Sequence, residues 1–124
     1  MALPKFYDLW DWREGRNLAL DIYSITSKFP VEEKYNLTSQ LRSASVSIPA
    51  NIAEGTGRGT KKDVNRFLKN ARGSAQEMIS HLDISHALKY LGDEKYEELF
   101  VRYNKLSVAI NNHISAIERS DPNP

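Results

Sequence analysis

The segment YEELFVRYNKLSVAINNHISAI, residues 96–117, decides the fold of this chain. Ring-bearing or aliphatic side chains recur in it three and four residues apart without a break: Tyr96, Leu99, Tyr103, Leu106, Ile110, His113 and Ile117. Because an α-helix makes one turn in about 3.6 residues, this spacing places them all on one helix face. The segment therefore predicts a long amphipathic helix whose apolar face must be covered by other elements.

The preceding segment predicts a second long helix. It opens with Thr60-Lys61-Lys62-Asp63, a pattern typical of a capping box in which the Thr60 hydroxyl and the Asp63 carboxylate satisfy free backbone amides. Its apolar stripe consists of Val64, Leu68, Ala71, Ala75, Met78 and Leu82. The pattern runs on to Leu91, where Gly92 is suited to cap the helix C-terminus. Such a helix is about 45 Å long.

Two more helices are predicted nearer the N-terminus. Asp8 is the expected N-cap of the first helix, and Pro30 ends it. Its stripe consists of Leu18, Ile22, Ile25 and Phe29. The stripe of the next helix consists of Leu37, Leu41, Ala44, Ile48 and Ile52. Pro49 lies inside that helix, removes one backbone hydrogen bond and predicts a kink.

These helices imply one all-α domain. No alternating strand pattern competes with them, and short connections join neighbouring helices in antiparallel fashion. The sequence of 124 residues, 40% of them hydrophobic, thus predicts an up-down-up-down four-helix bundle over residues 1–119. Residues 120–124, Ser-Asp-Pro-Asn-Pro, cannot continue a helix and are expected to form a flexible tail.

Composition excludes several classes of protein. The absence of cysteine excludes a disulfide scaffold, a thiol nucleophile and a cysteine metal cluster. The N-terminus lacks the apolar region of a secretion signal, and no stretch approaches the ~18 apolar residues of a membrane span. We therefore expect a cytoplasmic protein with no membrane partner.

The strongest local functional signal is a basic surface at the start of the third predicted helix. It consists of Arg58, Lys61, Lys62, Arg66, Lys69 and Arg72. Together with the one acid among them, Asp63, these residues carry a net charge of +5, whereas the remaining 11 basic and 15 acidic residues carry −4. On a helix the six side chains span about 140° of one side. Such a surface suits phosphates, but it is also what a solvated helix face with paired charges would look like.

Glycine is concentrated just before that helix, in Glu54-Gly55-Thr56-Gly57-Arg58-Gly59-Thr60-Lys61-Lys62. Backbone amides at a helix N-terminus can hold an anion. The spacing does not match a phosphate-binding P-loop, and no strand precedes it. We therefore interpret the segment as a tight interhelical turn that needs positive φ.

Catalytic and metal-binding signals are weak. Asp83-Ile-Ser-His86 is the one acid-x-x-His spacing, whereas a dinuclear bundle site needs two such copies on different helices. Glu77 and His81 are four residues apart and could pair, and His113 is interpreted as a hydrogen-bonded core histidine. No Gly-x-Ser-x-Gly elbow is present. We expect no enzyme activity, no metal and no cofactor.

Two features favour self-association. Trp10, Trp12, Tyr23, Phe67, Tyr90, Phe100 and Tyr103 are more aromatic residues than a core of this width usually holds. Some of them must lie partly exposed or in a subunit interface. Gly73 lies in mid-helix, where glycine costs about 1 kcal/mol relative to alanine, and it predicts a close helix–helix approach within or between chains.

Several blocks of the sequence resemble a known family. They are Tyr35–Arg42, Ser47-Ile-Pro-Ala-Asn-Ile-Ala-Glu-Gly55, Gly57-Arg-Gly-Thr-Lys-Lys62, Arg66-Phe67-Leu68 and Ala71-Arg-Gly-Ser74. Together they resemble the four-helix-bundle proteins encoded within intervening sequences of bacterial 23S ribosomal RNA genes, over nearly the whole chain from Leu9 and Trp12 onward.

The resemblance implies a left-handed up-down bundle that assembles as a ring-like homopentamer. It also implies kinship with the accessory proteins of diversity-generating retroelements, which are basic pentameric bundles that bind nucleic acid and a reverse transcriptase. It implies no catalytic residues. This chain departs from the usual pattern at Asp11, where an apolar residue is common, and at Gly15, where alanine is common. Both departures predict a weaker start of the first helix.

Two functions therefore remain open. The first is a non-enzymatic oligomer that binds RNA or DNA backbone through the basic surface, without reading bases. The second is a protein-interaction scaffold, whose basic surface meets an acidic partner or pairs within the oligomer. The sequence does not separate RNA from DNA.

Overall fold

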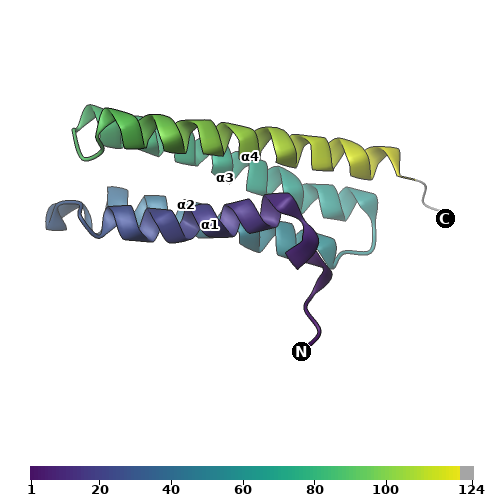
Figure 1. The fold of residues 1–124 in the computed structure, drawn as a ribbon. Helices are drawn as coiled ribbons and strands as arrows, with labels where there is room; N and C mark the ends of the chain where they lie inside the picture. Colours follow the sequence, from purple (N-terminus) through teal and green to yellow (C-terminus); the bar gives the residue numbers. More distant parts are fainter. Residues whose placement is uncertain (121–124) are drawn as a thin grey trace.

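The chain forms four long helices (Figure 1). The computed structural model describes residues 1–120, so residues 121–124 of the predicted tail lie outside the described residues. The helices are α1 (Trp10–Thr26), α2 (Leu37–Thr56), α3 (Lys61–Ala87) and α4 (Asp93–Arg119), with short 3-10 helices η1 (Lys5–Asp8) and η2 (Val31–Glu33). No strand occurs in this part of the chain. The all-α, four-helix prediction is confirmed.

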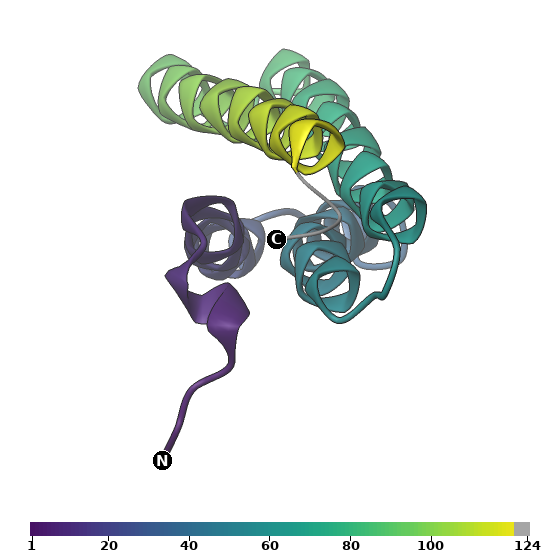
Figure 2. The ribbon, with the colours of Figure 1, turned by 90° about the vertical axis from the view of Figure 1, so that its right-hand side faces the viewer.

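Consecutive helices run in opposite directions along the bundle (Figure 1). Each helix packs against its sequence neighbours, and α4 also closes onto α1, as the view along the bundle shows (Figure 2). The residues joined across that last contact fit this arrangement, since Asp11 near the start of α1 meets His113 near the end of α4. The left-handed sense of the bundle stays a prediction.

The core is built from the predicted stripes. The residues with relative exposure of 1% or less include Leu18, Ile22, Leu41, Ile48, Ile52, Leu68, Met78, Leu82, Leu99, Tyr103, Leu106 and Ile110. Ile25, Val64, Tyr96 and Ile117 pack against this cluster from its edge. Burial raises the pKa of the Tyr103 hydroxyl. Other predicted aromatic residues are partly exposed, as expected: Trp10, Tyr23 and Phe100.

Gly15 lies where α1 packs directly against α2. A Cβ atom on Gly15 would lie 3.2 Å from Ile48 Cγ2 and 3.4 Å from Pro49 Cδ. The glycine at this position therefore makes room for α2, which continues through Pro49 as one helix. Gly73 has no such neighbour, since a Cβ there would meet nothing within 4 Å. The predicted close approach at Gly73 is therefore absent within the chain, and an approach between chains stays a prediction.

Polar side chains close the seam between α1 and α4. His113 Nδ1 lies 2.7 Å from Asp11 Oδ2, and Asp11 is only 5% exposed. The interpretation of His113 as a hydrogen-bonded histidine is thus confirmed, with its side chain 17% exposed at the edge of the core. Asp11, expected to weaken α1, instead supplies the partner of His113. Its acceptor role could not be read from the sequence, since the two residues are 102 positions apart.

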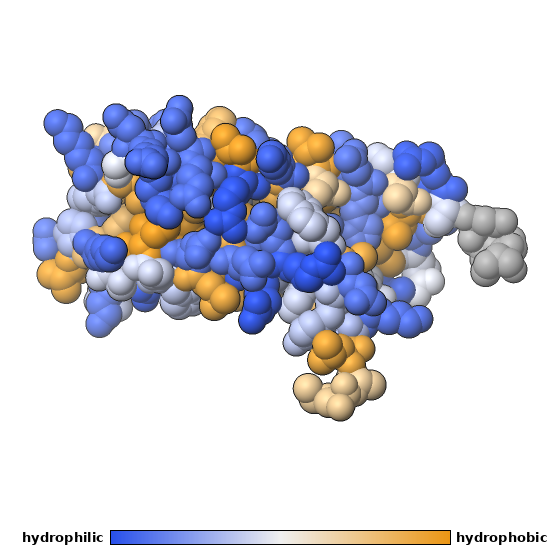
Figure 3. Space-filling model, in the orientation of Figure 1, coloured by the Kyte–Doolittle hydropathy of each residue, from blue (hydrophilic) through white to orange (hydrophobic). Residues whose placement is uncertain are grey.

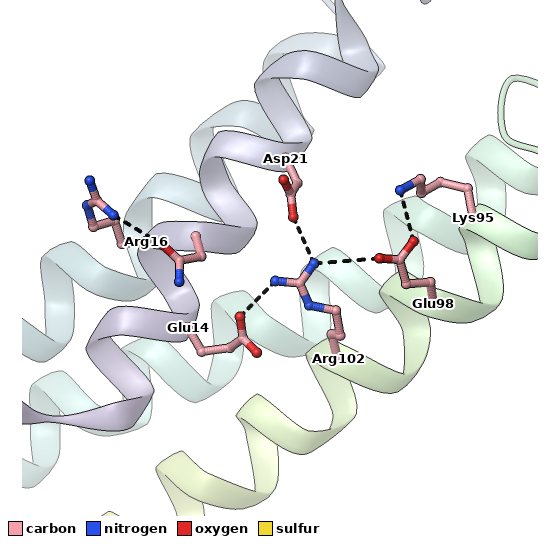
Figure 4. A network of polar contacts seen from close by, with 7 residues as sticks. Glu14, Arg16, Asp21, Lys95, Glu98 and Arg102 are labelled. Atoms are coloured by element: carbon pink, nitrogen blue, oxygen red, sulfur yellow. Dashed lines mark hydrogen bonds and ion pairs between the residues drawn. The ribbon is translucent and has the colours of Figure 1, made fainter.

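A second cluster lies further along the same seam (Figure 4). Arg102 of α4 donates to Glu14 at 2.8 Å and to Asp21 at 2.7 Å, both on α1. Glu98 of α4 lies 3.9 Å from the same guanidinium and also pairs with Lys95 at 2.8 Å. Half-buried ion pairs of this kind fix the register of two helices more than they add stability.

Three predicted helix ends are wrong, the first because α1 ends at Thr26 and does not continue to Pro30. Leu9, not Asp8, is the N-cap of α1, because Asp8 belongs to η1. α3 ends at Ala87 rather than Leu91, and the chain leaves it through Lys89, which has φ of 66°. Leu91 lies in the connection between α3 and α4, but its side chain packs into the core and is 5% exposed. It is apolar for that reason, and it therefore made the apolar pattern of the helix look longer than the helix is. Gly92 precedes α4 as its N-cap and does not cap α3.

The outer surface is mixed in character (Figure 3). The face in view alternates hydrophilic side chains with separate apolar ones. No helix of residues 1–120 has both the length and the apolar content needed to traverse a bilayer.

Candidate nucleic-acid interface

The first turn of α3 is held by a side-chain cap. The Thr60 hydroxyl oxygen accepts a hydrogen bond from the Asp63 backbone amide at 3.1 Å, as the capping-box pattern predicts. In the reciprocal half of a capping box the Asp63 carboxylate would accept from a free backbone amide, but here it has a different partner. The Asp63 carboxylate accepts from the Arg66 guanidinium, at 3.0 Å from Nε and 2.8 Å from Nη2.

The charges in this first turn oppose the helix dipole. The N-terminal end of a helix carries a partial positive charge, so basic side chains there cost about 0.3–1 kcal/mol each. Lys61 and Lys62 occupy these positions in α3, with Asp63 as the one acid of the turn. α4, by contrast, begins with Asp93 and Glu94. The start of α3 is thus positive both from its side chains and from its backbone, and it attracts anions.

The glycine-rich turn before α3 does not use positive φ. Gly57 has φ of −89°, and no glycine among the described residues has positive φ, so that interpretation of the turn is wrong. Gly55 is needed for another reason. A Cβ there would lie 3.2 Å from both Phe67 Cβ and the Val64 carbonyl oxygen, where the end of α2 meets α3.

A surface pocket of about 550 Å³ opens at this end of α3. Its lining consists of Gly59, Thr60, Lys62, Asp63, Arg66 and Lys69, and we call it the α3 pocket. Lys62, Arg66 and Lys69 form an i, i+4, i+7 row along the helix. This row rises about 10 Å, which matches about three nucleotides of a duplex strand at 3.4 Å each.

Two arginines of the basic surface converge on Phe67. The guanidinium carbon of Arg58 lies 4.5 Å from the Phe67 ring centroid, and that of Arg66 lies 4.3 Å from it. Arg58 also pairs with Glu54 and lies 3.7 Å from Asp63. The sequence analysis named Phe67 only among the aromatic residues that exceed what the core can hold. Its position next to Arg66 in the sequence was the available signal that an arginine would lie over its ring.

The remaining basic residues divide into two groups. Lys61 donates to the carbonyl oxygens of Glu118 and Ser120 and so caps the end of α4. Arg72 donates to Asn111 at 2.7 Å, which also joins α3 to α4. Lys62 and Lys69 are exposed and form no ion pair with any residue of 1–120. The structure therefore brings Lys62, Arg66 and Lys69 together at the α3 pocket, whereas Lys61 and Arg72 face α4.

The histidines form pairs rather than a larger cluster. His81 lies 3.0 Å from Glu77, the pair that the spacing predicted. His86 lies 2.7 Å from Asp93 of α4 and stacks on Tyr96 at 4.3 Å between centroids. Within residues 1–120 no three acidic or histidine side chains come together as a metal site would require.

A family model described as 23S rRNA-intervening sequence protein matches residues 7–112. Since this match covers most of the chain and the structure has the four helices that the resemblance implied, the chain belongs to the 23S rRNA-intervening sequence protein family. Comparison with curated proteins gives no match.

The fold is also found in a solved structure. It is the crystal structure of a protein of unknown function from the S23 ribosomal protein family of Bacteroides thetaiotaomicron VPI-5482, with a TM-score of 0.78 and 21% sequence identity. The match covers 85% of this chain and 95% of that one. At this identity the likeness concerns the fold alone.

Proposed function

We propose that this protein is a non-enzymatic oligomer that binds the phosphate backbone of nucleic acid through its basic surface. The observation that carries the proposal is the α3 pocket, where Lys62, Arg66 and Lys69 line one cavity beside a helix N-terminus. Cations placed against the helix dipole reduce stability. A bound polyanion offsets that cost, because it neutralises the lysines and accepts from the free amides.

The pocket favours backbone contact over base readout. Its polar lining groups are two ammonium groups, a guanidinium, a hydroxyl and one carboxylate, and the cations suit phosphate oxygens of any sequence. We therefore expect affinity that depends steeply on salt and little on sequence.

Fluorescence anisotropy with labelled RNA and labelled duplex DNA across a salt series tests the proposal. The triple variant K62E/R66E/K69E should lose at least about 100-fold in affinity, since three phosphate contacts become repulsive. Circular dichroism should show unchanged helicity, because all three side chains are exposed. Equal affinity of the variant and the parent would refute a role of this surface. The ratio of RNA to DNA affinity identifies the preferred nucleic acid.

Oligomerisation is part of the proposal, with the pentamer as the number implied by the family resemblance. It is supported by apolar side chains that the rest of residues 1–120 leaves exposed, among them Leu20 and Val108 at 57% and 60% exposure. A ring would repeat the basic surface and raise its avidity. Native mass spectrometry measures the subunit number directly, and a monomer at micromolar concentration would contradict this part.

The alternative, a protein-interaction scaffold without nucleic-acid binding, is supported by a different surface. At the start of α4 a pocket of about 680 Å³ combines carboxylates with partly exposed apolar side chains; its lining is Glu94, Glu97, Glu98, Phe100, Val101 and Arg102. Capture of partners from lysate with and without nuclease separates the two functions. Partners retained after nuclease treatment favour the scaffold.

A further inference from the structure

Asp63 occupies an unusual place in the basic surface. It is the one acid between Arg58 and Arg72, and it lines the α3 pocket together with the basic row. Its side chain is 34% exposed. Both of its carboxylate oxygens face arginines, with Oδ1 accepting from Arg66 at 2.8 and 3.0 Å and Oδ2 3.7 Å from Arg58 Nε.

The backbone of α3 also holds Asp63 in position. It lies in the first turn of α3, where the helix dipole favours a negative charge. Its backbone amide donates to the Thr60 cap. The carboxylate therefore stays at the rim of the pocket, and the two guanidinium groups, which also lie over Phe67, are the groups that reach it.

A guanidinium binds carboxylate and phosphate with the same donor fork. The position of the Asp63 carboxylate beside Arg66 is thus the position that a phosphate oxygen would take. A phosphate entering the α3 pocket meets Lys62 and Lys69 without competition, but it must share or displace Asp63 to reach Arg66.

We infer that Asp63 is a built-in competitor that makes this surface select strands of closely spaced phosphates over single anions. This inference rests on the proposed function. A lone phosphate makes too few contacts for its binding free energy to offset the loss of the ion pair between Asp63 and Arg66. A strand that engages Lys62 and Lys69 together places its next phosphate beside Arg66 at high effective concentration, and the exchange then succeeds.

The test compares D63N with a matched variant, E118Q. Each removes one negative charge at the same end of the bundle, but the Glu118 side chain forms no ion pair with Arg58 or Arg66. The probes are a labelled single-stranded RNA of twelve nucleotides in anisotropy and inorganic phosphate in calorimetry. D63N should raise RNA affinity on the order of fivefold, as expected for loss of one surface ion pair, and E118Q should raise it less than about twofold.

A double-mutant cycle identifies the group that Asp63 competes for. The gain from D63N should vanish when Arg66 is already replaced in R66Q, because the guanidinium is then absent. D63N should gain more in affinity for inorganic phosphate than for the RNA, because only the single anion is kept from Arg66 in the parent; an unchanged ratio of the two affinities would overturn the selectivity. D63S also removes the carboxylate and repeats the measurement if D63N is poorly folded.

The outcomes separate this inference from the proposed function. Equal gains in D63N and E118Q, or an undiminished gain in the R66Q background, overturn the competitor role while RNA binding by the parent stands. If the parent protein does not bind RNA at ~50 mM salt, where electrostatic affinity is strong, the proposed function fails, and the inference fails with it.

Discussion

The starts of α3 and α4 offer a direct comparison, because both helices have 27 residues and both follow a turn that contains glycine. α4 begins with Asp93 and Glu94, as the helix dipole favours, whereas α3 begins with Lys61 and Lys62, which the dipole disfavours. We call these regions the acidic end and the basic end of the bundle. One end follows the rule for stability and the other departs from it, and such departures mark functional surfaces.

The two turns differ in a second respect. The turn at the basic end holds Gly57 and Gly59, yet its backbone stays at negative φ. The turn at the acidic end holds Lys89 at φ of 66°, the region in which glycine is favoured. At the basic end the tight spacing falls on Gly55, where a Cβ would lie 3.2 Å from Phe67 Cβ, whereas a Cβ on Gly59 would meet nothing within 4 Å.

The largest expected effect concerns nucleic-acid affinity at the two ends. K62E/R66E/K69E should lose at least about 100-fold, whereas E94Q/E97Q/E98Q should change affinity less than about threefold. The two ends are separated by the length of a 27-residue helix, about 40 Å, and charges farther apart than a Debye length of about 8 Å are screened at physiological salt. Similar changes in the two variants, measured by anisotropy at 150 mM salt, would remove the distinction between the ends.

The next effect concerns the backbone of the turns. Lys89→Gly should stabilise the protein by about 1 kcal/mol, since a non-glycine residue in the left-handed region costs 1–2 kcal/mol. Gly57→Ala should be neutral or stabilising by about 0.4–1 kcal/mol, because its φ is negative and the nearest atom to a new Cβ lies 3.7 Å away. Urea unfolding measures both, and a destabilised Gly57→Ala protein would mean that glycine is needed there for another reason.

A smaller effect isolates the helix dipole. Lys62→Glu should raise the free energy of unfolding by about 0.3–1 kcal/mol, and Glu94→Lys should lower it by a similar amount. The first variant would thus be more stable than the parent while binding nucleic acid less tightly. Thermal unfolding at low salt checks both signs, and the difference should shrink in 1 M salt.

The smallest effect is a response of the acidic end to alkaline pH. A hydrogen bond to Glu33 raises the pKa of Tyr90, and partial burial followed by the charge of Asp83 raises the pKa of Tyr96. The folded protein holds these protons more tightly than the unfolded chain. The free energy of unfolding should therefore fall as the pH rises above about 10, the ordinary pKa of tyrosine. Y90F/Y96F should lessen the fall, and an unchanged alkaline unfolding curve would argue against these bonds.

Helical periodicity was enough to predict the four helices and nearly all of the core, because each stripe is a local property of the chain. It failed at the end of α3, because Leu91 lies in the connection after the helix and is apolar since it is buried in the core. Contacts between distant residues were also out of reach. Asp11 gives no sign of its pairing with His113, and only the packing of α1 on α4 brings them together.

The candidate site was predicted as a set of charges but not as a geometry. The row of Lys62, Arg66 and Lys69 follows from helical spacing, so the sequence identifies it. That Lys61 and Arg72 turn to α4 depends on where the partner helix lies, which no local pattern reveals. The role of Asp63 likewise required the positions of two guanidinium groups that come from different elements.

The seam between α1 and α4 has a consequence for the dynamics of the bundle. α1 and α4 meet each other only in a narrow contact that includes the polar bridges from Arg102 and His113, whereas α2 and α3 pack broadly on each other and each also packs on an outer neighbour. Regions with fewer buried contacts open at lower free energy. Amide hydrogens of α1 should therefore exchange with solvent through a separate local unfolding, and those at the centres of α2 and α3 only when the whole domain unfolds.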